Sequence, residues 1–167
     1  MPTPSDLIVV NATPLLALDA CDQLDLLRSL YKRVLIPEEV DRELAVGGDT
    51  ALPAGLTADH RTWIEVLPVT NPPSASLLAQ LDRGGAEVIT LALELGAVPV
   101  LIDENRGYQI AKGLGLVTVR SIGILLRAKR LGLITEVKPL LRMMKDKKIR
   151  ISDKLIHDAI ILAGETP

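Results

Sequence analysis

Short apolar runs alternate with longer segments of helical spacing along the whole chain. Five apolar runs of strand length predict β-strands at residues 7–10, 34–36, 64–69, 98–102 and 116–119. Apolar residues at helical spacing predict helices at residues 22–31, 37–45, 104–112, 122–131, 135–145 and 152–163. Strands that alternate with helices predict an α/β fold around a parallel sheet.

The segment from Gly84 to Arg106 holds the strongest local signal. It predicts a helix that carries Glu87 near its start, and then a buried strand that ends abruptly at Asp103. Ligand sites in parallel sheets lie beyond the carboxyl ends of the strands, so the carboxylate of Asp103 is a candidate metal or catalytic ligand. Aspartate also caps helices well, and Asp103 could instead cap the helix that follows it.

Further polar side chains follow the first two predicted strands. Asn11 ends the first strand, and the helix after the second strand carries the acids Glu38, Glu39, Asp41 and Glu43. Such residues can converge on one cleft at the edge of a parallel sheet. Crowded carboxylates repel one another unless a divalent cation neutralises them, and oxygen ligands select Mg²⁺ or Mn²⁺ over zinc. Such an ion can activate water for phosphodiester cleavage.

Length and composition indicate one globular domain over residues 1–167. The chain has no apolar stretch long enough for a membrane helix, and its start, MPTPSD, lacks the basic and apolar regions of a signal peptide. A single cysteine, Cys21, excludes an internal disulfide and a cysteine-rich zinc site. We therefore expect a cytoplasmic protein without a membrane partner.

Charge is separated along the chain, although the formal net charge is only −2. Residues 120–154 contain eleven Lys and Arg against three acids, a net charge of +8, while the preceding residues contain eight bases and sixteen acids. A basic surface attracts the phosphate backbone of nucleic acids. The alternative is an ordinary solvated helix surface, because the chain has almost no aromatic side chains on which bases could stack.

Four motifs follow one another in the order VVNATPLLAL, LIPEEVDREL, GGAEVITLALELGAVPVLIDENRGYQIAKGLGL and RSIGILLRAKRLGLI. In their order and spacing these motifs closely resemble the PIN-domain superfamily, and the resemblance covers nearly the whole chain. More narrowly, the chain resembles a PIN-like subgroup of unknown function that is similar to VapC-type toxins. The resemblance implies a three-layer α/β/α sandwich with a central parallel sheet. It also implies an Mg²⁺- or Mn²⁺-dependent endoribonuclease, often a toxin restrained by an antitoxin protein and usually a homodimer.

The resemblance also implies a set of site residues. It matches Asn11 to the first acidic position of PIN nucleases, and Glu43 to the glutamate of the helix after the second strand. It matches Glu87 to the acid of the central helix and Asp103 to the acid after the next strand, with Glu104 as a further possible ligand. These residues are predicted to hold the metal, and the first four to act in catalysis.

The chain departs from the family pattern at three positions. Asn11 offers an amide oxygen but no negative charge. Gly85 stands where many relatives carry a further glutamate, and Arg120 stands where relatives often have glycine. Thr13, Arg120 and Ser121 are predicted to lie near the cleft, where they could contact the substrate.

Each candidate also has a purely structural interpretation. Asn11 could cap a helix, Glu43 could be an exposed helix acid, and Glu87 could favour the helix dipole. A PIN-like module with weak or no catalysis, which binds RNA or a partner protein, is therefore the main alternative. A flavodoxin-like or phosphatase-like domain would need a phosphate loop or a nucleophilic aspartate, and residues 11–14 supply neither. Four apolar residues could form a dimer interface or part of the core, namely Leu125, Leu131, Leu133 and Leu140.

Overall fold

The computed structural model of the chain describes residues 6–46 and 56–167. The strands are β1 (Leu7–Val10), β2 (Arg33–Pro37), β3 (Ile64–Leu67), β4 (Val100–Leu101) and β5 (Thr118–Val119). The helices are α1 (Ala12–Ala20), α2 (Leu26–Leu30), α3 (Glu38–Val46), α4 (Ala75–Gln80), α5 (Arg83–Glu94), α6 (Asn105–Gly113), α7 (Ser121–Arg130), α8 (Lys138–Asp146) and α9 (Asp153–Leu162). The first five residues, on which the signal-peptide expectation rests, and residues 47–55 lie outside this description.

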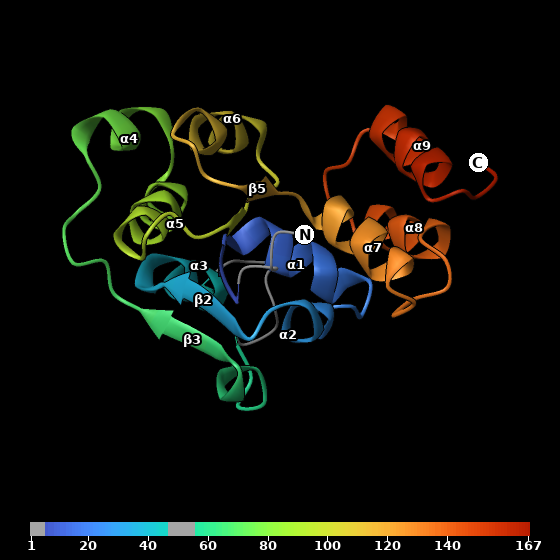
Figure 1. The fold of residues 1–167 in the computed structure, drawn as a ribbon, viewed down its shortest axis with the longest axis horizontal. Helices are drawn as coiled ribbons and strands as arrows, with labels where there is room; N and C mark the ends of the chain where they lie inside the picture. Colours follow the sequence, from blue (N-terminus) through green and yellow to red (C-terminus); the bar gives the residue numbers. More distant parts are fainter. Residues whose placement is uncertain (1–5, 47–55) are drawn as a thin grey trace.

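The strands form one parallel sheet in the order β3-β2-β1-β4-β5 (Figure 1). The chain first places β2 and β3 on one side of β1, and then returns to place β4 and β5 on the other side. Val10 pairs with Leu101, so Asn11 and Ile102 leave β1 and β4 at the same level. The predicted α/β fold with a central parallel sheet is therefore confirmed. Successive strands are added in one direction from β1 to β3 and in the other direction from β4 to β5, so the strand order reverses between β1 and β4.

Helix α1 begins directly after β1. The side-chain oxygen of Asn11 accepts a hydrogen bond from the N–H of Ala12 (2.9 Å), which caps the helix. Pro14 lies in the first turn, where the helix does not need its missing N–H. The helix-capping interpretation of Asn11 is thus confirmed, and this role does not exclude a second one in a ligand site.

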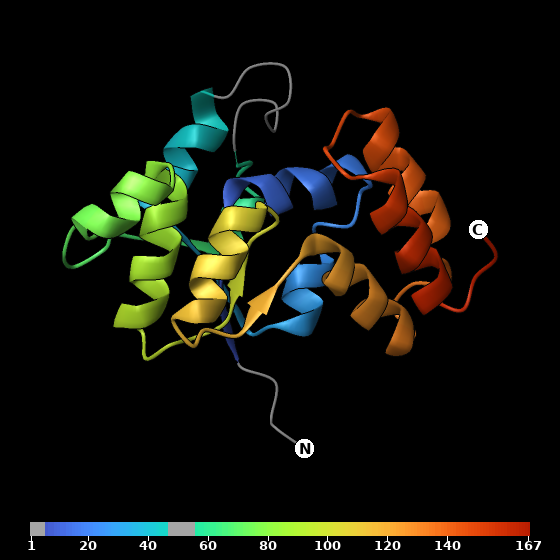
Figure 2. The same cartoon turned by 90° about the horizontal axis from the view of Figure 1, so that it is seen from above.

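Helices surround the sheet, and α5 packs across β1, β2 and β4 (Figure 2). Its inner face is apolar and includes Val88, Ile89 and Leu91, which are buried. Helix α3 packs against the same helix and against β2, so α3 and α5 meet beside the sheet. Among the described residues, no helix combines the length and the apolar character that a membrane span needs.

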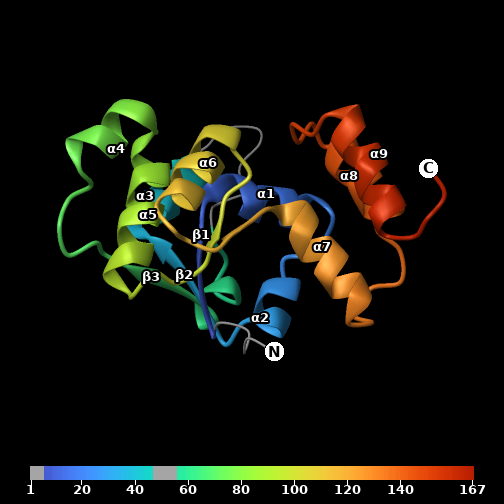
Figure 3. The same ribbon diagram turned by 45° about the horizontal axis from the view of Figure 1, so that its top comes forward.

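Helices α7, α8 and α9 lie together at the end of the molecule away from α4 and α5 (Figure 3). Helix α9 packs against α7 and α8, and α8 packs against α1. Leu125 belongs to the core, whereas Leu131 and Leu133 are 60% and 47% exposed. The exposed pair leaves apolar surface on this part of the molecule, where a second copy of the chain could bind. The homodimer itself stays a prediction.

Candidate functional site

A small cavity lies where β1 and β4 end. Its volume is about 180 Å³, and it is lined by Asn11, Thr13, Gln80, Leu81, Asp82, Gly85, Ile102, Glu104 and Gly107. The sheet order reverses between β1 and β4, and ligands in open α/β sheets bind in the crevice at such a point. The cavity therefore has the position expected of a ligand site.

Asn11 is held in this cavity by β4 and α1. Its N–H donates to the carbonyl oxygen of Leu101 (3.0 Å), and its side-chain oxygen accepts from Ala12. The residue is only 9% exposed. Its amide nitrogen faces Gly85, where a Cβ atom would lie 3.9 Å away. Asn11 thus lines the cavity without a negative charge, and its amide oxygen is the acceptor that caps α1.

Asp82 is a cavity residue that the sequence pattern did not single out. It caps α5, because its Oδ1 accepts a hydrogen bond from the N–H of Gly85 (2.8 Å). A Cβ atom at Gly85 would lie 2.9 Å from the same oxygen, so the glycine leaves room for this cap. The available signal was an aspartate just before an apolar helix, which is typical of an N-cap.

Glu43 reaches from α3 to the start of α5, where it lies against Gly84. The nearby backbone N–H of Gly84 favours the charged form of this carboxylate and so lowers its pKa. Burial, followed by the carboxylates of Asp82 and Glu39, raises the pKa of Glu43 to about 7. Such crowding of carboxylates is what a divalent cation relieves.

The raised pKa of Glu43 should make stability depend on pH. Between the ordinary pKa of 4.5 and the folded value of about 7, the folded protein holds a proton that the unfolded chain releases. The free energy of unfolding therefore falls as the pH rises through this range, and this contribution stays constant above it. Because the side chain is partly exposed, solvent screening limits the expected change to about 1 kcal/mol.

Urea unfolding of the wild type and of Glu43→Gln, at about pH 5 and about pH 7.5, measures this contribution. When the pH is raised, the free energy of unfolding of the wild type should fall by about 1 kcal/mol more than that of the variant. Glu38→Gln is the matched control, since Glu38 is an exposed glutamate of the same helix. The same pH dependence in the wild type and Glu43→Gln would show that Glu43 titrates normally.

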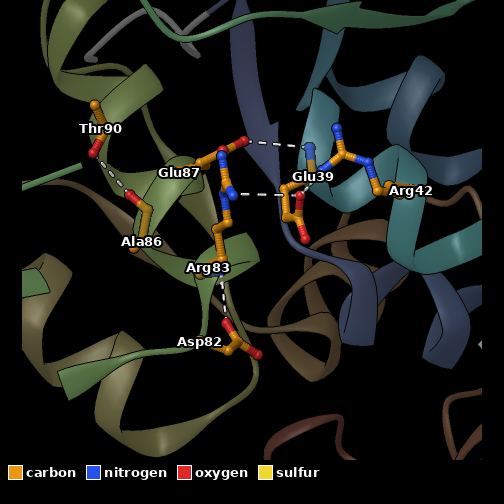
Figure 4. Close-up of polar contacts among 8 residues, drawn as sticks. Glu39, Arg42, Asp82, Arg83, Ala86, Glu87 and Thr90 are labelled. Atoms are coloured by element: carbon orange, nitrogen blue, oxygen red, sulfur yellow. Dashed lines mark hydrogen bonds and ion pairs between the residues drawn. The ribbon is translucent and has the colours of Figure 1, made fainter. Parts of the chain in front are cut away.

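Glu87 is buried and directed toward α3 (Figure 4). Its Oε2 accepts a hydrogen bond from the N–H of Glu39 (3.2 Å), and its Oε1 accepts one from Nε of Arg83 (3.3 Å). Arg42 forms an ion pair with Glu39 from within α3. These contacts join the start of α3 to the first turns of α5, and Glu87 does not line the cavity.

Asp103 is the neighbour of the cavity residue Glu104, but its carboxylate is bonded elsewhere. Its two oxygens accept hydrogen bonds from the N–H and the hydroxyl of Ser121, both 2.7 Å long. Burial raises the pKa of Asp103, and the two bonds from Ser121 oppose this effect. Asp103 thereby holds the start of α7 against the end of β4.

Helix α6, which follows Asp103, is capped by Glu104 instead. The two oxygens of Glu104 accept hydrogen bonds from the N–H groups of Arg106 (2.8 Å) and Gly107 (2.7 Å). The interpretation of Asp103 as the cap of the helix that follows it is therefore wrong, because this helix begins one residue later.

The three predicted substrate contacts lie in different environments. Thr13 is exposed and lines the cavity. Ser121 is 2% exposed and bonded to Asp103. Arg120 donates to the backbone oxygen of Asp103 (2.6 Å), and its guanidinium lies over the ring of Tyr108, 4.0 Å from the centroid. Of the three residues, only Thr13 lies where a ligand in the cavity would touch it.

The predicted metal ligands thus fall into three groups. Asn11 and Glu104 line the cavity, Glu43 and Glu87 lie between α3 and α5, and Asp103 lies against α7. In the described part of the chain, no three Asp, Glu, His or Cys side chains are arranged to hold an ion by themselves. Mg²⁺ usually binds one or two carboxylates and takes water and substrate phosphates as further ligands. The oxygen donors and the crowding around Glu43 fit such an ion.

Comparison with known protein families identifies the fold. A family model described as a PIN domain matches residues 7–165. The chain belongs to the PIN-domain family. Comparisons of this PIN domain with curated proteins and with solved structures gave no match. The PIN family has a nuclease-type fold, and its members generally use divalent metals. This agrees with the oxygen donors near the switch point of the sheet, which is the place between β1 and β4 where the strand order reverses.

Proposed function

We propose that this PIN domain is a metal-dependent endoribonuclease that hydrolyses RNA phosphodiester bonds. The observation that carries the proposal is the crowding of carboxylates around Glu43, beside a cavity at the switch point of the sheet. Crowded carboxylates cost free energy that a divalent cation offsets. Because the donors are all oxygen atoms, they favour Mg²⁺ or Mn²⁺.

We assign three carboxylates to the metal, namely Glu43, Asp82 and Glu104, with the side-chain oxygen of Asn11 as a neutral donor. Because the described carboxylates are not arranged to hold an ion by themselves, water and a substrate phosphate would complete its coordination. Asp82 and Glu104 already accept hydrogen bonds from backbone N–H groups. Each carboxylate oxygen keeps a further lone pair, so these caps are compatible with binding an ion. A bound Mg²⁺ or Mn²⁺ would lower the pKa of a water molecule and stabilise charge on the scissile phosphate.

Glu87 and Asp103 are assigned to support the site. Glu87 holds α3 against α5, and Asp103 holds α7 against β4. Direct coordination by either residue stays a prediction, and it would require these hydrogen bonds to rearrange.

RNA is the proposed substrate, and the basic segment at residues 120–154 supports this choice. Helix α8 of this segment packs against α1, the helix that begins at the cavity. Lys145 and Lys154 are exposed and form ion pairs with aspartates. Four further exposed cations lie on and after α8, namely Arg142, Lys147, Lys148 and Arg150. They can attract the RNA backbone toward this edge of the sheet, so RNA binding should weaken as salt increases.

The resemblance to VapC-type toxins supports two further proposals. The protein would act as the toxin of a toxin–antitoxin pair, restrained by a small antitoxin protein, and it would form a homodimer. An open reading frame for a small protein beside the gene, and the molar mass of the purified protein in solution, test these two proposals separately.

A PIN domain that binds RNA or a partner protein without cleaving RNA is the second candidate. The observation that favours it is the absence of a carboxylate at Asn11 and Gly85, the two cavity positions where the resemblance to PIN nucleases leads us to expect acids. A crystal soaked in Mn²⁺ distinguishes the candidates. Manganese between Glu43, Asp82 and Glu104 supports the nuclease, and an empty site supports the binding module.

Incubation of RNA with the purified protein tests the proposed function. Cleavage is expected with Mn²⁺, and a chelator should abolish it. Cleavage that continues at the same rate in the chelator would contradict a metal-dependent reaction.

A further inference from the structure

Arg83 is an exposed guanidinium that two less exposed carboxylates hold in place. Its Nε donates to Oε1 of Glu87 (3.3 Å) and lies 3.9 Å from Oε2 of Glu39. The Arg83 side chain is 66% exposed, whereas those of Glu87 and Glu39 are 7% and 17% exposed. Figure 4 shows the guanidinium between these two acids. The carboxylates therefore fix the position of a cation that remains open to solvent.

The terminal nitrogens of Arg83 are free of hydrogen bonds to the described residues. Two other arginines with carboxylate partners differ in this respect. Arg61 binds Asp41 through both terminal nitrogens, and Arg33 binds Glu65 through Nε and one terminal nitrogen. Arg83 thus keeps both terminal nitrogens available, and this planar pair of donors can bind a phosphate through two hydrogen bonds.

Arg83 belongs to the segment that forms one wall of the cavity, although it is not itself a lining residue. It follows Asp82 directly in the chain, and Asp82 and Gly85 line the cavity. Arg83 is the first residue of α5, a helix of 12 residues, so the positive end of the helix dipole lies at the same place. Guanidinium and helix end together favour an anion beside a group of carboxylates that would otherwise repel it.

We propose that Arg83 binds a phosphate group of the RNA that enters the cavity, and that Glu87 and Glu39 position its guanidinium. This assignment rests on the proposed RNA substrate. An Arg–Glu pair at i and i+4 on a helix surface contributes little to stability, while burial of a carboxylate is unfavourable. One oxygen of Glu87 joins α3 to α5 through the N–H of Glu39, and the other oxygen holds an exposed cation. Recognition of a phosphate gives that cation a role that the packing of the two helices does not require.

Binding of a fluorescent single-stranded oligoribonucleotide tests the proposal, with a chelator present to prevent cleavage. Arg83→Gln should weaken binding about tenfold or more, because a charge-assisted pair of hydrogen bonds is lost. The slope of log affinity against log salt should also decrease by about 0.7. Arg83→Lys keeps the charge but not the planar donors, so it should keep the slope and still bind more weakly than the wild type.

Arg33→Gln is the matched control. Arg33 lies at the amino end of β2, whereas the cavity lies at the carboxyl ends of β1 and β4. Its guanidinium is already bound to Glu65. This variant should bind the oligonucleotide as the wild type does. If Arg83→Gln binds as tightly as Arg33→Gln, the assignment of Arg83 is overturned while RNA binding stands. If the wild type itself does not bind the oligonucleotide, the proposed substrate is wrong and the assignment is overturned with it.

Glu87→Gln tests the positioning role separately from metal binding, because the chelator removes the metal. The variant should weaken oligonucleotide binding by several-fold, and thermal unfolding establishes that it is folded. Unchanged binding by folded Glu87→Gln would overturn the positioning role of Glu87.

Discussion

Replacement of Asn11 by aspartate is expected to tighten Mn²⁺ binding by about tenfold or more. Asn11 lines the cavity together with Asp82 and Glu104, and its amide adds no charge to theirs. Two unit charges 4 Å apart interact by about 4 kcal/mol at an effective dielectric constant of about 20. A third of that energy already corresponds to about a tenfold change in affinity. Isothermal titration calorimetry with Mn²⁺ measures the difference.

The same Asn11→Asp variant is expected to be less stable than the wild type without metal, by about 1–3 kcal/mol. The new charge would occupy a position that is only 9% exposed, close to other carboxylates. The cap on α1 should survive, because a carboxylate oxygen can also accept from the N–H of Ala12. Mn²⁺ should therefore raise the melting temperature of Asn11→Asp more than that of the wild type.

Asn71→Asp is the control for this experiment, because it adds the same charge at an exposed position away from the cavity. It should leave Mn²⁺ affinity unchanged. If Asn11→Asp binds Mn²⁺ no more tightly than Asn71→Asp, then residue 11 does not face the metal.

Gly84→Ala is expected to weaken Mn²⁺ binding while it leaves the free energy of unfolding nearly unchanged. Alanine is normally preferred to glycine inside a helix by about 0.5–1 kcal/mol. Here a Cβ atom would overlap Oε1 of Glu43 and come within 2.9 Å of its Cδ, while the end of this side chain can move aside. The free energy of unfolding should therefore change by less than about 1 kcal/mol. Mn²⁺ affinity should fall by about tenfold or more, because the displaced carboxylate no longer faces the site.

Gly113→Ala is the matched control for Gly84→Ala. Gly113 is also a helical glycine, and a Cβ atom there would meet nothing within 4 Å. Calorimetric titration of both variants and of the double variant Gly84→Ala/Glu43→Gln completes the test. Once Glu43 has lost its charge, Gly84→Ala should have no further effect on Mn²⁺ affinity. If Gly84→Ala binds Mn²⁺ as Gly113→Ala does, the assignment of Glu43 to the metal is contradicted.

The sheet could be predicted from the sequence because its strands are short, buried and apolar. The runs at residues 7–10 and 34–36 became β1 and β2 with nearly the same bounds. The runs at residues 98–102 and 116–119 became β4 and β5, of only two residues each, since Val100 and Leu101 are the residues of the first run that pair with Thr118 and Val119 of the second. The carboxyl ends of parallel strands meet at one edge, so the polar residues Asn11 and Glu104 could be expected to share a cavity.

Which of two adjacent acids enters the cavity could not be predicted. Asp103 and Glu104 both follow β4, and the choice depends on where α6 begins and on a hydroxyl of α7 that is distant in sequence. Asp82 was missed because a helix cap is an ordinary use of aspartate, and only the folded chain places that cap beside Asn11. The direction of Glu87 likewise depends on the packing of α3 against α5, which periodicity does not specify.

The most direct test of the account is the rate of Mn²⁺-dependent RNA cleavage by Glu43→Gln relative to the wild type. Loss of a group that only supports a metal ligand already costs about 10- to 100-fold. Removal of the Glu43 charge should therefore slow cleavage by at least about 100-fold, while Glu38→Gln in the same helix should cleave as the wild type does. Equal cleavage by Glu43→Gln and the wild type would contradict a metal-dependent ribonuclease site beside this cavity.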